Sequence, residues 1–291
     1  MGERDATLAA MRHQALAALV LAACAGRSGP LPPRAARAEA LMLPVPPGDV
    51  ILGSTPEERE RAYVDARRTA GDDRARQGRW FEREEPRHTV ARRGFLLDRT
   101  PVTQAMWAEY VRERGGVGPC IDAVAWRRQG YVQDFERVVA RMCWNGATPP
   151  DGRDDHPVVL VTHAEARAYC AWRGRRLPTA DELEHAARGT DGRIYPWGDR
   201  YEAARLASAD SGPGDTEPVD THPSGAGPYG HQDLAGNVFA WTSTPWTFEK
   251  GAFTVKGSAW DDHGGVGRGA ARHGRPLGAR HVIVGFRCAG D

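Results

Sequence analysis

Apolar and polar positions alternate along HTVARRGFLLDRTPVT, residues 88–103, and this period of two predicts a strand that ends at Pro101. Before it, residues 41–55 (LMLPVPPGDVILGST) form a short strand region that proline and glycine interrupt. Residues 56–87 are highly charged, which predicts a solvated excursion of the chain. Near the C-terminus, the apolar run HVIVGFRCA at residues 281–289 predicts a final strand.

Two helix starts stand out in the same pattern. Thr162 opens THAEARAYCAWRG and Thr179 opens TADELEHAARG, and each is followed three residues later by Glu, which makes a capping box. In such a box the hydroxyl and the carboxylate each bond one otherwise unpaired amide. The segments end at Gly174 and Gly189, which suit the left-handed position after a helix. A further helix is expected from Thr103 through QAMWAEYVRER.

The N-terminal region resembles a targeting signal. Residues 15–23 (ALAALVLAA) form an apolar run of nine that is too short to span a bilayer. The run ends in LAAC, like a lipobox, so we expect residues 1–24 to be a lipoprotein signal peptide, with Met11 as the true start. Lipidation of Cys24 would then anchor the exported protein to a bacterial membrane, at the periplasm or the cell surface. The alternative is an alanine-rich helix start with a chance cysteine.

Composition narrows the class of protein. The 34 Gly and 21 Pro among 291 residues predict a loop-rich fold with short elements. The 39 basic residues are balanced by 38 acidic ones along the whole chain, which gives no charge pattern for binding nucleic acid. Residues 25–40 are rich in Pro, Ala and Arg and predict a flexible tether. We expect residues 41–291 to form a single domain.

Cysteine usage agrees with export. If Cys24 carries the lipid, four cysteines remain: Cys120, Cys143, Cys170 and Cys288. An even set in an exported protein predicts two disulfides, for which the sequence leaves three pairings open. The alternative, four free thiols, would be typical of a cytosolic chain.

The order of the motifs resembles the formylglycine-generating enzyme family, also called the sulfatase-modifying factor domain. The resemblance covers most of residues 44–289 and implies an α/β (α+β) fold, a loop-rich variant of the C-type-lectin-like architecture with short strands and about three helices. The matching segments are PPGDVILGST; EPRHTVARRGFLLDRTPVTQAMWAEYV; HPVVLVTHAEARAYCAWRGRRLPTADELEHAARG; YPWGD; TEPVD; GPYGHQDLAGNVFAWTS; and VKGSAW, GAARHGRP and VIVGFRCA.

The resemblance also implies a disulfide pairing. Family members with Cys at the AYCAW and GFRC positions join them, which here are Cys170 and Cys288. Cys120 would then pair with Cys143 within residues 116–155, a segment that looks like an insertion.

Enzymes of this family oxidise a Cys of a target peptide to formylglycine, using two active-site Cys that bind Cu(I). Those Cys lie between a GSW-type strand and an AAR motif, and here that stretch, GSAWDDHGGVGRGAAR at residues 257–272, contains no Cys. Asp262 falls roughly where the first thiolate belongs. Carboxylates are hard ligands that do not replace a thiolate pair on Cu(I), so we expect neither copper nor the oxidase activity.

The calcium ligands of the family also look lost. Alignment on GPYG and GNVFAW puts Gly227 and Ala240 where a side-chain Asn and Glu are expected. Loss of two oxygen ligands should remove most of the affinity for calcium, so we expect no cofactor. At the other site the family has an Asn, in place of which this chain offers Ala207 or Ser208, with Asp210 and Asp215 as remaining acids.

A groove is expected beside the glycine-rich loops. Four Trp inside family motifs, Trp107, Trp172, Trp197 and Trp241, are expected in the core. Aromatic and Arg side chains in the groove would suit a peptide or a glycan. The alternatives are a zinc-like site that includes His281, whose spacing matches no defined motif, and turn caps that bond Arg272, Arg275 or Arg287. The candidate groove residues are Trp246, Trp260, Asp261, Asp262, His263, Arg272 and His273.

These observations favour a cell-envelope lipoprotein that is non-catalytic and binds a protein, peptide or glycan as an accessory module. An alternative is an enzyme, either an oxidase with a rearranged site or a changed enzyme that uses Asp262, His263 and Arg272. A third is a subunit that positions an active paralogue. A Ser-His-Asp hydrolase lacks a nucleophile elbow in this sequence. The ligand, the oligomeric state and the membrane leaflet stay open.

Overall fold

The structure is a computed structural model that describes residues 41–291, which lie within one compact unit. The predictions of a signal peptide, of lipidation at Cys24 and of a tether fall on residues 1–40 and so lie outside the described residues. None of the helices in the described part is long and apolar enough to cross a bilayer.

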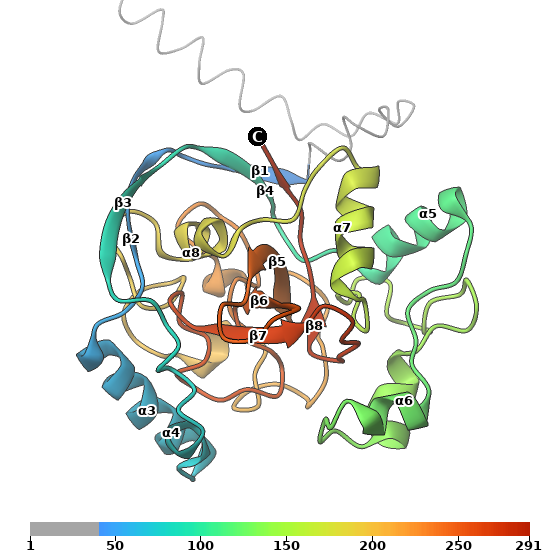
Figure 1. Ribbon diagram of the computed structural model, residues 1–291, viewed down its shortest axis with the longest axis horizontal. Coiled ribbons are helices and arrows are strands. Elements are labelled where there is room, and N and C mark those ends of the chain that lie inside the picture. The colour runs from blue at the N-terminus through green and yellow to red at the C-terminus, as the bar shows by residue number, and fades with distance from the viewer. Residues whose placement is uncertain (1–40) are drawn as a thin grey trace, which may run out of the picture. The chain divides into compact units, whose positions relative to one another are not determined.

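Three small sheets hold the strands of residues 41–291 together (Figure 1). One has the antiparallel order β1-β4-β9, one pairs β2 with β3, and the third has the order β7-β6-β5-β8. In the third sheet β5 and β8 run parallel, and the other neighbours are antiparallel. The strands are β1 (Met42–Val45), β2 (Gly48–Leu52), β3 (His88–Arg92), β4 (Phe95–Asp98), β5 (Phe239–Pro245), β6 (Ala252–Lys256), β7 (Arg272–Pro276), β8 (Val284–Gly285) and β9 (Ala289–Gly290).

The helices begin where the capping boxes predict. The backbone amides of Glu165 and Glu182 donate to the hydroxyls of Thr162 and Thr179 at 3.3 and 3.1 Å. Gly189 directly follows the second of these helices with φ of 61°. The helices are α3 (Pro56–Ala70), α4 (Arg74–Gln77), α5 (Gln104–Arg114), α6 (Ala123–Arg128), α7 (His163–Trp172) and α8 (Ala180–Arg188), with short helical turns at Phe135–Val139, Ala140–Met142, Ala203–Arg205 and Pro223–Gly225.

Two strand predictions are wrong in their extent. The segment from residue 88 to Pro101 is two strands, because β3 pairs with β2 whereas β4 pairs with β1, and Arg93 and Gly94 between them belong to neither. The segment 281–289 is mostly not strand. Between β8 and β9 the buried Arg287 donates to four backbone carbonyls, those of Asp98, Arg99, Gln232 and Asp233, so this side chain replaces a regular ladder.

The excursion, residues 56–87, is not simply solvated. It forms α3 and α4, and Thr55 starts α3 with a capping box of its own. Tyr63 and Phe81 are buried, with ring centroids 4.8 Å apart. Glu84 forms a buried ion pair with Arg268. The charged face of the helices therefore covers an apolar face that packs on the rest of the fold.

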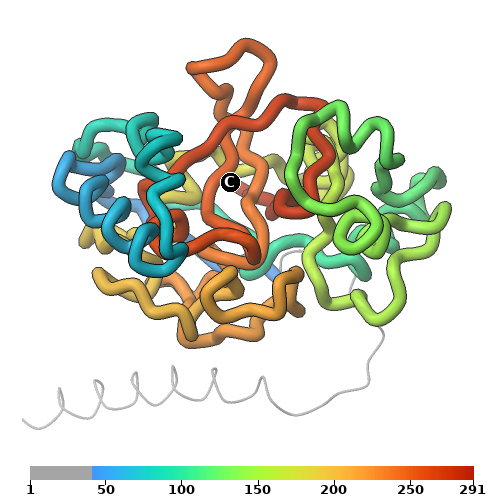
Figure 2. Tube along the Cα trace, turned by 90° about the horizontal axis from the view of Figure 1, so that it is seen from below, coloured from blue at the N-terminus to red at the C-terminus, as the bar shows by residue number. Residues whose placement is uncertain are grey.

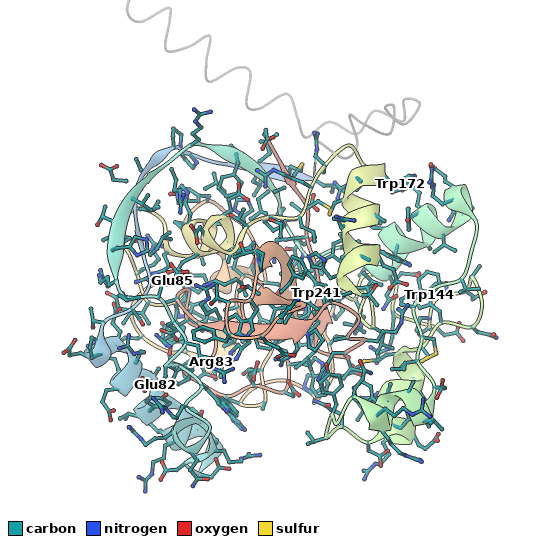
Figure 3. All side chains as sticks on the ribbon, viewed as in Figure 1. Glu82, Arg83, Glu85, Trp144, Trp172 and Trp241 are labelled. Carbon is teal, nitrogen blue, oxygen red and sulfur yellow. A yellow bond between two sulfur atoms is a disulfide. The ribbon has the colours of Figure 1, made fainter. Side chains whose placement is uncertain are left out.

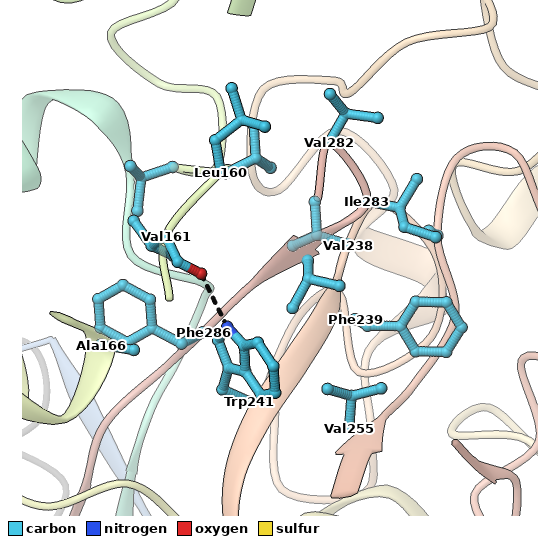
Figure 4. Packing of buried hydrophobic residues seen from close by; sticks show 14 of the residues in the cluster. Leu160, Val161, Ala166, Val238, Phe239, Trp241, Val255, Val282, Ile283 and Phe286 are labelled. Carbon is cyan, nitrogen blue, oxygen red and sulfur yellow. Dashed lines mark hydrogen bonds between the residues drawn. The ribbon is translucent and has the colours of Figure 1, made fainter. Parts of the chain in front are cut away.

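Trp241 lies at the centre of the main core (Figures 3 and 4). It is fully buried, and its indole N–H donates to the carbonyl oxygen of Val161 at 3.0 Å. Trp107 is also buried, whereas Trp172 and Trp197 are only partly covered. The core prediction is therefore confirmed for two of the four Trp and holds in part for the others.

Two disulfides close the fold. Cys170 of α7 bonds Cys288, 118 residues later, and Cys120 bonds Cys143 across 23 residues of the insertion. These are the pairs that the family resemblance implies.

Candidate functional site

The segment Gly257–Arg272, where the family has its active-site cysteines, lies between the excursion, residues 56–87, and residues 116–155, which we continue to call the insertion (Figures 1 and 2). The excursion with α3 and α4 lies on one side of the sheet that contains β7, and the insertion with α6 lies on the other (Figures 1 and 2). Both the excursion and the insertion contact the Gly257–Arg272 segment. Glu85 of the excursion pairs with Arg272, and Gln133 of the insertion bonds Asp261.

Trp260 does not line this groove. Its side chain is only 6% exposed and belongs to the main core. The indole N–H donates to the carbonyl oxygen of Val282 at 3.3 Å, and the backbone N–H donates to that of Asn237 at 3.0 Å. These two hydrogen bonds hold the start of the Gly257–Arg272 segment in place, and the indole is too buried to contact a ligand.

Asp261 and Asp262 point to different partners. Oδ2 of Asp262 accepts the backbone N–H of Ala259 at 2.9 Å and closes a turn, while Oδ2 of Asp261 accepts the side-chain amide of Gln133 at 2.7 Å. Burial raises the pKa of both carboxyls, and the negative charge of Asp261 raises the pKa of Asp262 further. Oδ1 of Asp261 is buried without a hydrogen-bond partner in residues 41–291.

His263 lies outside the groove, against the excursion. Its Nδ1 is 2.6 Å from Oδ1 of Asp210, whose second oxygen accepts the hydroxyl of Tyr201 and the amide of Gly264. Burial opposes ionisation of Asp210, but the hydrogen bonds from Tyr201 and His263 outweigh it and lower the pKa of the carboxyl. His263 and Asp210 line an open cavity together with Arg68. The imidazole thus joins the loop after residue 262 to the loop of Asp210, and the amide of Gly264 joins the same loop to α3 by donating to Oγ1 of Thr69 at 3.0 Å.

Arg272 and His273 begin β7 and differ in their surroundings. Arg272 pairs with Glu85, and its guanidinium lies 5.7 Å from the ring centroid of Trp246. The ring of His273 meets Phe239 edge-on at 5.3 Å, and its Nε2 is buried with no partner in the described chain. Burial, and then the charge of Arg275, lowers the pKa of His273 to about 3, so the imidazole is neutral.

Trp246 anchors an aromatic surface that we name the Trp246 platform, made of Arg83, Trp246, Phe248 and Arg272. Trp246 itself is 5% exposed, whereas Phe248, at the tip of the β5–β6 hairpin, is 60% exposed. The guanidinium of Arg83 lies 6.0 and 5.5 Å from the two ring centroids. Exposed aromatic and arginine groups in contact are typical of recognition surfaces.

The alternative of a changed enzyme requires the side chains of Asp262, His263 and Arg272 to meet in one site, and they do not. The three side chains bond Ala259, Asp210 and Glu85 respectively, which lie in different parts of the fold. Among the described residues, no group of three or more His, Cys, Asp or Glu side chains is placed to hold a metal ion.

The family's copper and calcium ligands can be compared with the residues present. All four cysteines of residues 41–291 are in disulfides, so no thiolate pair exists there for Cu(I). Of the acids left at the calcium positions, Asp210 is held as described and Asp215 pairs with Arg153 and, at 3.1 Å, with Arg141. A Cβ added at Gly227 would stand 2.8 Å from the carbonyl oxygen of Ala186, so no larger ligand residue fits there. The residues present fit neither metal.

Three members of this site are absent from the sequence-based set. Gln133 lies in the insertion and meets Asp261 across 128 residues, a pairing without any local signal. Arg83 belongs to the charged excursion, where no single arginine stands out. Phe248 could have been found, because it is an aromatic residue in a polar stretch, between Thr247 on one side and Glu249, Lys250 and Gly251 on the other.

Known proteins share both the sequence and the fold. The formylglycine-generating enzyme of Mycobacterium tuberculosis is 34% identical over 57% of this chain and 69% of its own length. The inactive C-alpha-formylglycine-generating enzyme 2 of Bos taurus is 31% identical over 71% of this chain and 80% of its own length. The structure of PvdO from Pseudomonas aeruginosa superposes with a TM-score of 0.64 at 20% identity, over 86% of this chain and 94% of that one.

These likenesses confirm the predicted fold class, a loop-rich mixed α and β architecture of the C-type-lectin-like kind. Residues 28–291 match the family described as "Sulfatase-modifying factor enzyme 1-like domain". The chain therefore belongs to the sulfatase-modifying factor family, that of the formylglycine-generating enzymes.

Proposed function

We propose that this protein is a non-catalytic member of the family, a pseudoenzyme that binds a protein, peptide or glycan partner at the cell envelope. The observation that carries the proposal is the state of the sulfur atoms. No Cys lies between Cys170 and Cys288 in the sequence, and these two are bonded to each other. The oxidation of a peptide thiol in this family depends on a free pair at that place.

The neighbours of the acid pair support the same conclusion. Gln133 bonds Asp261, and Tyr131, from the same insertion, packs against His281 with ring centroids 3.8 Å apart. The insertion therefore contacts Asp261, within the segment where the family carries its thiolates. A relative of similar length carries the printed name of an inactive enzyme, so loss of activity occurs within the family.

The Trp246 platform supports a binding role. Phe248 presents an exposed ring, and Arg83 stacks on it without a contacting carboxylate in the described chain. A ring plus a guanidinium suits the faces of sugars and the side chains of peptides. We infer that the partner is held here, beside β7.

Mass spectrometry tests the non-catalytic proposal. The purified chain is incubated with Cu(I), oxygen and a Cys-containing sulfatase-motif peptide, with the Mycobacterium tuberculosis enzyme as the positive control. We expect the aldehyde product from the control alone. Formation of aldehyde by this chain would overturn the proposal and favour a rearranged oxidase.

Peptide and glycan arrays test the binding surface. We expect Phe248→Ala and Arg83→Ala each to lower binding to the ligands of the wild-type chain by about tenfold, the size of one hot-spot contact. Val132→Ala, a change at a 93% exposed residue of the insertion, serves as the control and should bind like the wild type. Array ligands that bind all four proteins equally would place the partner elsewhere.

We also propose that the domain is lipid-anchored through Cys24 after export. The LAAC sequence and the two disulfides support this, because structural disulfides are typical of proteins outside the cytosol.

A further inference from the structure

A cavity lies apart from the Trp246 platform, between the β3–β4 connection and α8. Its volume is about 690 Å³, and none of the residues that line it belongs to the Trp246 platform or to the Gly257–Arg272 segment. The residues that matter for its chemistry are Arg92, Arg93, Phe95, Arg176, Thr179 and His185.

His185 contributes a buried polar atom to this cavity. The residue is 1% exposed, its ring meets Phe95 edge-on at 6.0 Å, and its Nε2 is 3.4 Å from the hydroxyl of Tyr229. Nδ1 is buried and has no hydrogen-bond partner in residues 41–291. Burial, and then the charge of Arg92, lowers the pKa of His185, so the ring is neutral. When the phenol donates to Nε2, Nδ1 carries the proton and is a donor without an acceptor.

The arginines at the cavity leave donors unused as well. Arg92 pairs with Asp181, but its Nε is buried with no partner in the described residues. Arg176 bonds both nearby acids, Glu182 at 2.8 Å and Asp291 at 2.7 Å. Two arginines therefore pair with three acids, Arg92 with one and Arg176 with two.

Arg93 brings the number of arginines at the cavity to that of the acids, and it is the one without an ion pair. It is exposed between β3 and β4 and contacts no carboxylate in the described part of the chain. The cavity thus combines one unpaired charge with two buried N–H groups that lack acceptors, on Arg92 and His185. Buried donors without acceptors are costly, and a ligand with acceptor oxygens would satisfy them.

We propose that this cavity binds an oxyanion, a carboxylate, phosphate or sulfate group. Arg93 supplies the charge, Nε of Arg92 and Nδ1 of His185 donate hydrogen bonds, and Phe95 packs against the body that carries the anion. The site is separate from the Trp246 platform, so it does not depend on the proposed function.

NMR of the histidine Cε1–H signals tests the site in the full 291-residue chain. Inorganic phosphate, inorganic sulfate and acetate are titrated separately at constant ionic strength. We expect a saturable shift of the His185 signal with at least one of them, and a rise in the pKa of His185 because the bound charge favours the imidazolium. A packing role alone would leave this pKa unchanged.

The exposed position of Arg93 makes Arg93→Gln a safe variant for folding. We expect it to weaken anion binding about tenfold, the usual size of one charge-assisted contact. Arg114→Gln, at an exposed arginine of α5, is the matched control and should bind as the wild type does. Drift of the signal without saturation, or equal affinity in both variants, would overturn the proposal.

Two experiments distinguish a free anion from a lipid headgroup as the source of the bound oxyanion. A free anion predicts saturation with phosphate, sulfate or acetate and no difference between vesicles of phosphatidylglycerol and phosphatidylcholine. A lipid headgroup predicts co-sedimentation with phosphatidylglycerol vesicles alone, abolished by Arg93→Gln and retained in Cys24→Ala, so that the lipid anchor plays no part. Failure of both experiments would mean that the cavity is not an anion site.

Discussion

Gln133 donates its side-chain amide to Oδ2 of Asp261 at 2.7 Å, and so ties the insertion to the acid pair in the segment where the family carries its thiolates. The second acid, Asp262, is held by the amide of Ala259, and no cation of residues 41–291 forms an ion pair with it. A buried carboxyl beside another carboxyl is a source of pH dependence that can be measured.

We predict that Asp262→Asn stabilises the protein at alkaline pH. Burial and the charge of Asp261 raise the pKa of Asp262 to about 8, well above the unfolded value of about 4. Between these values the folded state keeps a proton that the unfolded state releases, so stability falls as the pH rises through this window. Asn keeps the acceptor for Ala259 and should gain roughly 2 kcal/mol at pH 8 in urea unfolding.

The control for this variant is Asp49→Asn, at an exposed position of β2. It should change the unfolding free energy by less than about 0.5 kcal/mol at either pH. An equal gain for Asp262→Asn at pH 5 and pH 8 would show that the effect is not ionic.

Burial of His273 should lower the stability of the protein at acid pH, whereas burial of Asp262 lowers it at alkaline pH. Its pKa of about 3 lies below the unfolded value of about 6.5. The unfolded state therefore binds a proton that the folded state refuses, and stability falls as the pH drops from 6.5 to 3. Besides Arg275, the cations that disfavour the charged ring are Lys256, Arg268 and Arg83.

Below pH 6.5 the unfolding free energy of the wild type should fall with a slope that corresponds to the uptake of protons on unfolding. We expect His273→Gln to reduce that slope by the contribution of about one proton, measured by urea titration at several pH values. His88→Gln, at an exposed position of β3, should leave the slope as it is in the wild type. Parallel curves for the wild type and His273→Gln would contradict the burial of a neutral imidazole.

Lys256 joins α8 to β6 and to the Gly257–Arg272 segment. Its Nζ lies 2.9 Å from Oε2 of Glu184 and 2.7 Å from the carbonyl oxygen of Gly269, with the side chain only 4% exposed. We predict that Lys256→Met costs about 3 kcal/mol, because it leaves Glu184 with less compensation for its burial. Thermal and urea unfolding measure the loss.

The chain offers a matched control, since its only other lysine, Lys250, is exposed. Lys250→Met should stay within about 0.5 kcal/mol of the wild type. In addition, Glu184→Gln combined with Lys256→Met should recover part of the loss, and no recovery would argue against a charge effect.

The two disulfides should differ in what their removal costs. Replacement of Cys170 and Cys288 by Ala opens a loop of 118 residues, and replacement of Cys120 and Cys143 opens one of 23. The chain-entropy model gives about 4–5 kcal/mol for the first and about 3 kcal/mol for the second. Denaturant unfolding of the two double variants checks this order, and a reversed order would mean that the insertion contributes more to the fold than its size suggests.

Cys24→Ala should release the protein from the membrane fraction, because a lipid on Cys24 is the proposed anchor. Fractionation of cells that express the wild type and the variant measures the shift. Cys120→Ala with Cys143→Ala is the control for the loss of sulfur as such. Equal solubility of the wild type and Cys24→Ala would contradict the lipobox interpretation.

Local signals explain which parts of the fold could be predicted. The starts of α7 and α8 follow from four residues each, because a capping box bonds its own neighbours. The same signal at Thr55 marks α3, although the dense charge there suggested a solvated segment. In the excursion, a few apolar positions such as Tyr63 outweigh many charges once they find a partner.

The site depends on contacts that no local pattern specifies. Gln133 reaches Asp261, His263 reaches Asp210 across 53 residues, and Glu84 reaches Arg268 across 184. The loss of the thiolates could be seen in the sequence because it is a matter of residue type. The hydrogen-bond partners of the polar residues could not be predicted, because even neighbours in sequence such as Asp262 and His263 bond different parts of the fold.

The bond between Cys170 and Cys288 sets the time at which this domain can be completed. The last eight residues supply β8, β9 and one half of that disulfide, and β9 pairs with β4 near the start of the domain. Residues 284–290 must therefore have left the ribosome before the native topology can close. A nascent chain that has not yet emerged as far as residue 284 should be open to protease along most of its length.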